Sequence, residues 1–270
     1  MLNWTYFDNS QKDKSFECFL NEQAVVDEEQ TGRHQVKFAA YDNKEFVIKR
    51  YSPLDKKSWF RRLDLALKNL VTPDAKRSYQ GCVLVYESGV PTMKPVAWAH
   101  RGVGLNCESY FVYEAIEAQA GVHDLLGQEN LSPDLKRELI VKMGKISRQL
   151  HDAGLRHTDI VPHNFLAQKR SDGGFELYLI DTDKVSKVKG LTRLPRLKAF
   201  FDWHCLRRLR LREPELKVFF SAYLGRTPAE EDVSAWYFWL AGGLNLYRQL
   251  KKRLGRDAYM CSLDLSLIRG

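Results

Sequence analysis

The stretch that decides the fold is Leu150–Asp183, which reads LHDAGLRHTDIVPHNFLAQKRSDGGFELYLIDTD. Its pattern predicts the end of a helix, a polar loop, a short hairpin and a buried strand, in that order. The loop carries Asp159 and Asn164, and the apolar run Leu177–Ile180 brings Asp181 to the end of a strand. The segment therefore places two carboxylates and one amide at the ends of a loop and a strand.

Those residue types at that spacing are typical of phosphoryl transfer. His157, Asp159 and Asn164 form H-x-D-x-x-x-x-N, the catalytic loop of kinase-fold enzymes. We predict that Asp159 is the catalytic residue, because a carboxylate can accept the proton of an attacking hydroxyl. Magnesium prefers hard oxygen ligands, so Asn164 and Asp181 are the predicted metal ligands. ATP and Mg²⁺ are the expected cofactors.

A well-marked helix precedes the loop. Ser132 is its predicted N-cap, Pro133 occupies the first turn and Gly154 ends it. An apolar stripe along this helix should anchor the catalytic loop against a core. His151 lies in that stripe and is interpreted as a structural histidine.

The N-terminal part predicts a short helix followed by a strand meander. The helix is expected over Ser15–Leu20, and the strands over Gln23–Asp27, His34–Tyr41 and Glu45–Arg50. Gly32, in the first turn, is the predicted phosphate-covering glycine. It stands alone, so this turn is not the G-x-G-x-x-G loop of protein kinases.

Lys49 ends the apolar run FVIK and is predicted to bind the phosphates of ATP. The alternative is an edge-strand lysine that points into water. Arg50 should point to the opposite face of the strand. Two helices should follow, over Ser58–Leu70 and from Thr72 to Gly89, with Thr72 as N-cap of the second.

The second of these helices should take the place of the kinase helix that pairs with the strand lysine. Its only glutamate, Glu87, lies near its end and Asp74 lies at its start, so the partner of Lys49 is left open. Strands are predicted over Val96–Arg101 and Ser109–Ala115. In a kinase fold the chain after the second strand is the adenine-binding hinge, which corresponds to Glu114 and Ile116. An ordinary strand-to-loop exit is the alternative.

The fold class expected from this order is α+β, a protein-kinase-like two-lobed fold. Residues 1–270 should form a single domain with a small antiparallel-sheet N-lobe (1–116) and a mainly helical C-lobe (117–270). With 270 residues, of which 44% are hydrophobic, the chain is long and apolar enough for such a core.

Bulk composition limits the surroundings of the protein. The formal charge of +8 favours an anionic partner. The five cysteines show no C-x-x-C pair, so we expect reduced thiols, each a small buried hydrophobe. The N-terminus lacks a signal-peptide core and Ala235–Leu246 is too short to span a bilayer, so export and membrane spanning are not expected.

A basic segment follows Asp181. Its cations are the predicted substrate-binding candidates: Lys184, Lys187, Lys189 and Arg193. More arginines follow over Arg207–Arg212 among apolar residues. The region is either a solvated helix face or a surface for anionic headgroups, and the sequence leaves both open.

The quoted segments resemble the lipopolysaccharide core kinases, the Kdo/heptose kinase family of Gram-negative bacteria. The likeness rests on LHDAGLRHTDIVPHNFL, YLIDTDKV, FVIKRY and GVPTMKPVA and spans roughly Gln23–Phe201. It implies transfer of the γ-phosphate of ATP to a heptose or Kdo hydroxyl of the inner core. The implied setting is cytoplasmic and peripheral, on the inner face of the inner membrane. The implied partners are the lipopolysaccharide core and lipid A acceptor and an anionic membrane surface, without nucleic acid.

The chain departs from protein kinases at Asp181-Thr182-Asp183, where they have D-F-G. This argues against a switchable activation loop and leaves a sugar kinase possible. One alternative is a small-molecule phosphotransferase of the aminoglycoside or choline kinase type. Another is a catalytically inactive kinase-fold scaffold. The sequence leaves open which hydroxyl is phosphorylated and the oligomeric state.

Overall fold

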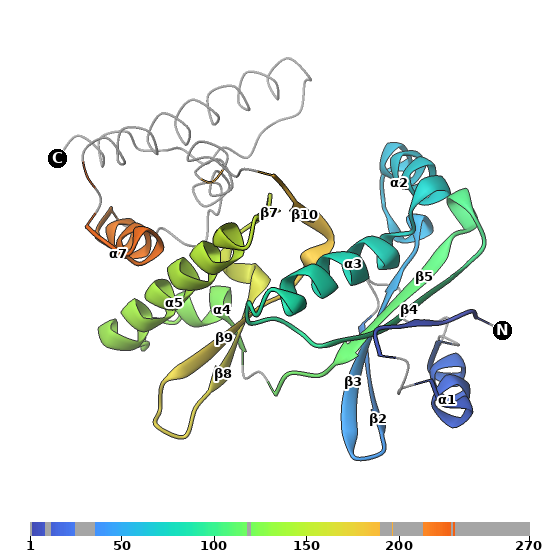
Figure 1. The fold of residues 1–270 in the computed structure, drawn as a ribbon, viewed down its shortest axis with the longest axis horizontal. Helices are drawn as coiled ribbons and strands as arrows, with labels where there is room; N and C mark the ends of the chain where they lie inside the picture. The colour runs from blue at the N-terminus through green and yellow to red at the C-terminus, as the bar shows by residue number, and fades with distance from the viewer. Residues whose placement is uncertain are drawn as a thin grey trace. The chain divides into compact units, whose positions relative to one another are not determined.

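The computed structural model describes residues 2–8, 12–24, 36–117, 120–189, 196, 213–227 and 229. The chain divides into two compact units. Unit 1 comprises Met1–Glu117 and Asp181–Val185, and unit 2 comprises Ala118–Ile180 and Ser186–Gly270. Both units combine helices with antiparallel strands (Figure 1), as the predicted α+β class requires.

Unit 1 is built on a five-stranded sheet with the order β1-β4-β5-β3-β2 and antiparallel pairing throughout. Its strands are β1 (Thr5–Tyr6), β2 (Val36–Tyr41), β3 (Lys44–Tyr51), β4 (Pro95–Arg101) and β5 (Glu108–Glu114). Asp42 and Asn43 form the β2–β3 turn with positive φ angles of 49° and 59°. A two-residue turn with positive φ at both positions matches the right-handed twist of the flanking strands, and Asn and Asp tolerate this conformation.

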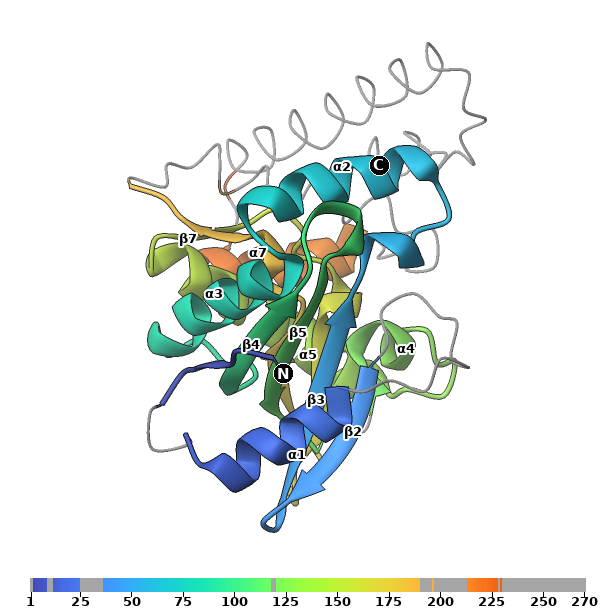
Figure 2. The ribbon, with the colours of Figure 1, turned by 90° about the vertical axis from the view of Figure 1, so that its right-hand side faces the viewer.

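One helix packs on each face of this sheet. α1 (Lys14–Ala24) lies against β2 and β3 (Figure 2) and buries Phe16, Leu20 and Ala24 in a core with Phe46 and Ile48. α3 (Asp74–Glu87) packs on β3, β4 and β5 through its buried side. Because successive strand residues alternate between faces, the sheet presents different residues to the two helices.

Two further elements complete this part of unit 1. A 3-10 turn, η2 (Pro53–Asp55), leads into α2 (Trp59–Val71), and a second 3-10 turn, η3 (Gly104–Asn106), lies between β4 and β5. α2 contacts both turns. The expected helices and the strands over residues 36–51 and 95–114 are thus present.

Two local predictions are wrong. Gln23 and Ala24 end α1 rather than begin a strand, because Phe16, Leu20 and Ala24 recur at a spacing of four and bury one helical face. Thr72 does not cap α3. Its N–H instead donates to the carbonyl of Lys68 at 2.9 Å and closes α2, and Pro73 is the residue that directly precedes α3.

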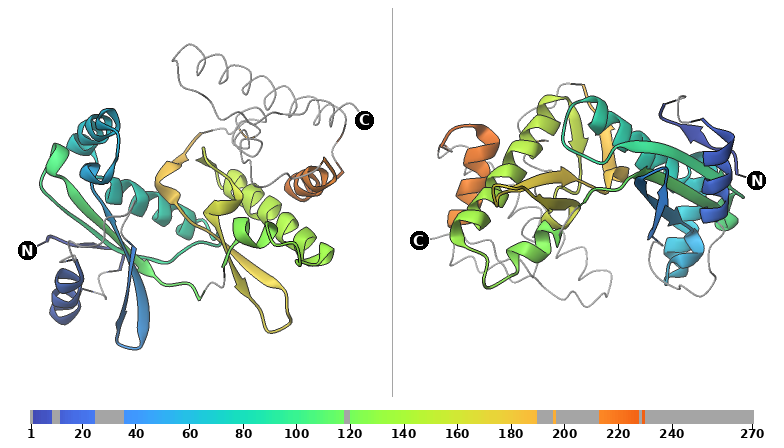
Figure 3. Two further views of the ribbon diagram at one scale, coloured as in Figure 1. Left: turned by 180° about the vertical axis from the view of Figure 1, so that it is seen from behind. Right: turned by 90° about the horizontal axis from the view of Figure 1, so that it is seen from below.

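Unit 2 is centred on α5 (Pro133–Asp152). The Ser132 hydroxyl accepts a hydrogen bond from the Leu135 N–H at 3.3 Å, and Gly154 follows the helix with a φ of 72°, so both predicted ends are confirmed. α7 (Glu213–Leu224) packs beside α5 (Figure 3). A Cβ at Gly144 would lie 2.6 Å from the Phe219 carbonyl oxygen, so glycine permits this close helix contact.

The remaining elements of unit 2 include the segment that carries His157, Asp159 and Asn164. A three-stranded sheet has the order β6-β8-β9, and β7 pairs with β10. The bounds are β6 (Ala120–Gly121), α4 (Val122–Leu126), β7 (Leu155–His157), η4 (Pro162–Asn164), β8 (Phe165–Lys169), β9 (Phe175–Leu179) and β10 (Val185–Lys187). β10 follows η5 (Thr182–Lys184), a 3-10 turn of unit 1.

Burial tests the prediction for the cysteines. Cys82 and Cys107 are buried, but Cys18 is exposed on α1, so the prediction is wrong for Cys18. Cys205, Cys261, Arg207–Arg212 and Ala235–Leu246 lie outside the described residues. In the part of the chain that the structure describes, the helices are all too short or too polar to cross a membrane.

Candidate active site

The H-x-D-x-x-x-x-N motif forms one hydrogen-bonded loop in unit 2. His157, at the end of β7, is buried, and its Nδ1 accepts the backbone N–H of Asp159 at 3.0 Å. The Asn164 Nδ2 donates to the backbone carbonyl of Asp159 at 2.8 Å. Both backbone groups of Asp159 are therefore held by the other two motif residues, which explains why the motif needs this spacing.

The loop is also tied to the strand that leads to Asp181. The N–H of Ile180 donates to the carbonyl of Asn164 at 2.8 Å, directly after β9. β9 pairs with β8, which begins immediately after Asn164. Asp181 is the next residue along the chain, so its Cα lies about 3.8 Å from that of Ile180.

Lys49 and Asp181 form an ion pair in unit 1. The Lys49 Nζ lies 2.9 Å from Asp181 Oδ1, although 132 positions separate the two residues. Asp181 has φ 60° and ψ 54°, a left-handed conformation that costs energy in residues other than glycine. Residues held in such conformations cluster at functional sites, so the strain singles out Asp181 as a candidate site residue.

The surroundings of Lys49 keep its amine charged. Burial lowers the pKa of Lys49, but Tyr51 and Asp181 outweigh burial and raise it overall. The amine also lies 5.2 Å from the centre of the Tyr51 ring, a cation–π distance. The Tyr51 hydroxyl is fixed in turn by a 2.9 Å hydrogen bond with the Ser78 hydroxyl on α3. A fixed cation of this kind suits the binding of phosphate oxygens.

α3 holds the segment after Asp181 through small residues. The Thr182 hydroxyl donates to the carbonyl of Ser78 at 2.9 Å, and both residues are buried. A Cβ added at Gly81 would collide with the Thr182 carbonyl oxygen. We call Ser78, Gly81 and Thr182 the α3 seat. It fixes the backbone that carries Asp181.

Among the ion pairs of the described residues, Lys49 pairs with neither Asp74 nor Glu87, the two helix carboxylates considered for it. Asp74 forms an ion pair with Arg77, and Glu87 is exposed at the last turn of α3. Asp74 and Glu87 lie at the two ends of the helix, whereas the α3 seat occupies its middle. Asp181 takes the role of carboxylate partner instead.

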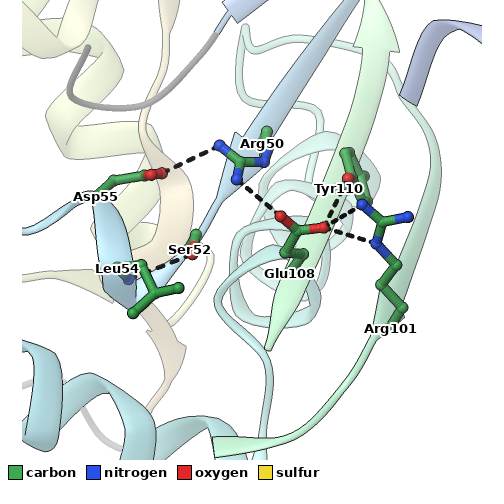
Figure 4. Close-up of polar contacts among 7 residues, drawn as sticks. All are labelled: Arg50, Ser52, Leu54, Asp55, Arg101, Glu108 and Tyr110. Atoms are coloured by element: carbon green, nitrogen blue, oxygen red, sulfur yellow. Dashed lines mark hydrogen bonds and ion pairs between the residues drawn. The ribbon is translucent and has the colours of Figure 1, made fainter. Parts of the chain in front are cut away.

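Arg50 lies on the opposite face of β3, as strand alternation predicts. Its guanidinium donates to Glu108 Oε1 at 2.8 Å and lies 3.5 Å from Asp55 Oδ2 (Figure 4). Glu108 also accepts from the Arg101 Nε at 2.6 Å. Lys49 alone of the two neighbouring cations is therefore directed to Asp181.

The predicted hinge residues lie at and just beyond the end of β5. The Glu114 carboxylate pairs with the Lys94 amine at 2.7 Å, and the backbone N–H of Glu114 donates to the Lys94 carbonyl at 3.0 Å. Ile116 follows the strand and is partly buried. Their assignment to adenine binding stays a prediction.

The basic candidates are only partly described. Lys184 ends η5 in unit 1, while Lys187 and Lys189 belong to unit 2, and all three are exposed. Arg193 and the predicted phosphate-covering Gly32 lie outside the described residues.

Two of the predicted site residues carry oxygen donors of the kind that magnesium prefers. In residues 2–8, 12–24, 36–117, 120–189 and the shorter described segments, His, Cys, Asp and Glu nowhere gather in a group of three that could hold a metal ion. Mg²⁺ usually takes one or two protein oxygens together with phosphates and water. Asn164, with its Nδ2 bound to Asp159, and Asp181 are donors of that kind.

His151 has the structural role that the sequence indicated. It is buried, and its Nδ1 lies 2.7 Å from the hydroxyl of Tyr223 on α7. Burial, followed by the charge of Arg196, lowers its pKa to about 3. His151 is therefore neutral near pH 7 and joins α5 to α7.

Sequence reasoning missed the α3 seat and Tyr51. Ser78, Gly81 and Cys82 place small residues on one side of α3, and such a run indicates a close backbone approach to a helix. That signal shows that something packs there but does not say which segment of the chain it is.

Comparison with known proteins identifies the family of this chain. The model of the lipopolysaccharide kinase (Kdo/WaaP) family matches residues 17–193. This is more than half of the chain, so the chain belongs to the lipopolysaccharide kinase (Kdo/WaaP) family, as the resemblance predicted.

Similar curated proteins include several named 3-deoxy-D-manno-octulosonic acid kinase. One from Haemophilus influenzae is 32% identical over 124 residues, covering 44% of this chain and 49% of that protein. One from Vibrio cholerae is 28% identical over 139 residues, covering 49% of this chain and 56% of its own length. The matched part of this chain thus spans about half the length of these relatives.

A solved structure is similar over almost the whole chain. It is described as WaaP in complex with acyl carrier protein, and it covers 92% of this chain and 97% of its own. The TM-score is 0.60 at 19% identity. The likeness shows that this chain shares the fold of that protein.

Proposed function

We propose that this protein is an ATP-dependent kinase that phosphorylates a hydroxyl of Kdo in the lipopolysaccharide inner core. Family membership supports a lipopolysaccharide substrate, and the names of the relatives favour Kdo over heptose. In this proposal the chain is one kinase-like domain, with an N-lobe over residues 1–116 and a C-lobe over residues 117–270.

The ion pair between Lys49 and Asp181 is the observation that carries the proposal. The sequence assigns the first of these residues to the ATP phosphates and the second to the metal. They lie 2.9 Å apart despite a separation of 132 positions in the sequence. A nucleotide–metal complex requires its phosphate-binding cation and its metal-binding carboxylate to be neighbours.

The proposed roles follow from the side chains. Asp159, on the loop fixed by His157 and Asn164, accepts the proton of the sugar hydroxyl. Lys49 binds phosphate oxygens, and Asn164 and Asp181 would hold Mg²⁺. When bound, the metal would offset negative charge on the phosphates. The hydrogen bond from Ile180 to the Asn164 carbonyl supports this metal pair, because Asp181 is the next residue along the chain.

The other assigned residues complete the proposal. Gly32 would cover the phosphates, and Glu114 and Ile116 would bind the adenine. The cations Lys184, Lys187, Lys189 and Arg193 would bind the acidic acceptor, whose Kdo carboxylates and lipid A phosphates attract a chain of charge +8. We place the enzyme on the cytoplasmic face of the inner membrane as a peripheral protein.

A transfer assay tests the proposal. The purified protein is incubated with ATP, Mg²⁺ and truncated core acceptors that end in Kdo or in heptose, and each product is weighed for an added phosphate. We expect phosphate on the Kdo-terminated acceptor, and no product with Asp159→Asn. The control is Asp172→Asn, at an exposed aspartate in the β8–β9 turn.

The other outcomes each point elsewhere. Phosphate only on the heptose-terminated acceptor would move the proposal to heptose. Phosphate only on soluble aminoglycosides or choline would favour a small-molecule phosphotransferase. Nucleotide binding that is absent with and without Mg²⁺ would favour an inactive scaffold.

A further inference from the structure

α2 in unit 1 carries an exposed apolar stripe. Trp59 is 61% exposed, Phe60 66%, Leu67 57% and Val71 85%. Leu63 and Leu70, also exposed, lie between them along the helix. At 100° per residue these six residues cover about a third of the helix circumference. The helix packs instead through the adjoining edge, where Ala66 and Asn69 are buried.

The tip of the β4–β5 turn extends this stripe. Val103 and Leu105, on either side of Gly104, are exposed. A Cβ at Gly104 would lie 3.7 Å from a methyl group of Leu70, so the turn lies directly against the helix. We call the combined set the α2 surface: Trp59, Phe60, Leu63, Leu67, Leu70, Val71, Val103 and Leu105.

Cations accompany these apolar residues. Residues 56–71 contain five basic residues and a single acidic one: Lys56, Lys57, Arg61, Arg62, Lys68 and Asp64. Asp64 is paired with Lys68 at 2.7 Å. Lys57 and Arg61 are exposed, so positive charge lies beside the apolar stripe.

An ion-pair network holds the supports of α2 in place. Arg50 pairs with Asp55 in η2 and with Glu108 at the start of β5, and Glu108 also binds Arg101 at the end of β4 (Figure 4). The network therefore links η2 to the strands on both sides of η3. Both turns contact α2, so the α2 surface is preformed rather than dependent on a partner.

We propose that the α2 surface docks unit 1 onto an anionic phospholipid bilayer. A helix with aromatic and leucine side chains on one stripe and Lys and Arg beside it is suited to lie in the plane of a bilayer interface. Tryptophan in particular favours the headgroup level. Anionic headgroups over hydrocarbon offer both chemistries that this surface presents side by side. The inference deepens the proposed function and rests on it, since a lipid-anchored acceptor would be met at that interface.

Vesicle sedimentation tests the inference without ATP or acceptor. The full chain is mixed with vesicles of phosphatidylcholine alone or with phosphatidylglycerol added. We expect binding that requires phosphatidylglycerol and that falls at least tenfold in the double variant Trp59→Ser with Leu67→Ser. The matched control is Phe38→Ser, because Phe38 on β2 of the same unit is 70% exposed but is remote in sequence from α2.

A second measurement avoids any effect on folding. In vesicles that contain brominated lipid, the tryptophan fluorescence of the wild-type chain should be quenched. In Trp59→Phe, which keeps an aromatic ring, vesicle binding should persist and most of the quenching should be lost. Quenching that is unchanged in Trp59→Phe would show that α2 does not enter the interface.

The failure of this inference can be told apart from failure of the proposed function. The double variant should still phosphorylate a water-soluble Kdo acceptor at the wild-type rate. Equal vesicle binding by wild type and double variant would overturn the α2 surface. So would self-association of the wild type, or its capture of an acidic protein, that is lost in the double variant while vesicles are ignored.

Discussion

The loop of unit 2 that carries the proposed catalytic Asp159 and the Lys49–Asp181 pair of unit 1 are built in opposite ways. The loop is closed by hydrogen bonds that span two and five residues. The ion pair spans 132 residues, and the bond from Thr182 to Ser78 in the α3 seat spans 104. The loop therefore depends on local sequence, whereas the ion pair depends on the whole of unit 1 being folded.

The difference shows how a carboxylate can be positioned without a helix glutamate. α3 offers the carbonyl of Ser78 and the bare backbone of Gly81, and the chain after Asp181 packs onto them. Lys49 then pairs directly with Asp181. The held residue, Thr182, stands at the position where protein kinases have the phenylalanine of D-F-G.

The largest expected effect comes from the loop. Asp159→Asn should lower the rate of phosphate transfer about 10²- to 10⁴-fold, the range for removal of a general base. The fold should persist, because the bonds to His157 and from Asn164 use the backbone of Asp159. Steady-state kinetics and circular dichroism check both points. A variant that keeps full activity would remove Asp159 from the mechanism.

The next effect tests the ion pair. Lys49→Met should weaken the binding of Mg²⁺–ATP about 10- to 100-fold, because hydrogen bonds to a charged group contribute about 1.5–3 kcal/mol. Lys44→Met, on the same strand but exposed, should bind as the wild type does. Calorimetric titration gives the affinities. Equal losses in both variants would mean that general charge, not position, sets the affinity.

The α3 seat can be tested without touching a charged group. Gly81→Ala should destabilise the fold by about 1–3 kcal/mol, typical of an added methyl group in a packed site, and weaken nucleotide binding with it. Alanine is the better helix former by about 1 kcal/mol, so helix propensity alone predicts the opposite sign. Gln80→Ala, exposed on the same helix, is the control. Unfolding in denaturant supplies the free energies, and a more stable Gly81→Ala variant would refute the seat.

The smallest effect concerns His151, which joins α5 to α7. The pKa of His151 is lowered to about 3 by burial and by Arg196, so His151 favours folding above its unfolded pKa of about 6.5. That contribution is lost as the pH falls toward 3, and between pH 6.5 and 5 the loss should be about 1.5 kcal/mol. Chemical unfolding at each pH would show this slope. His151→Gln should flatten it, and an unchanged slope in that variant would assign it to other groups.

The sequence predicted the local features of the fold better than those that depend on residues far apart in the chain. The helix from Ser132 to Gly154 and the strands around Lys49 depend on neighbours a few positions away. Capping signals, alternation and motif spacing express such neighbours directly. They also predicted the opposite directions of Lys49 and Arg50.

The wrong predictions involve either competing local signals or contacts between residues far apart in the sequence. The local composition at Gln23 and Ala24 favours a strand, but the helical spacing of Phe16, Leu20 and Ala24 extends α1 through them. Thr72 was predicted as the N-cap of α3, but it closes α2, and Pro73 stands between it and α3. The partner of Lys49 was sought on a helix, since nothing local links position 49 to position 181.

The most direct test is a crystal structure with Mg²⁺ and a non-hydrolysable ATP analogue. We expect one magnesium ion bound by the Asn164 amide oxygen and the Asp181 carboxylate, with the Lys49 amine on phosphate oxygens and Asp159 facing the γ-phosphate. A nucleotide bound without Lys49, or a metal ion that ignores both Asn164 and Asp181, would contradict the proposed site.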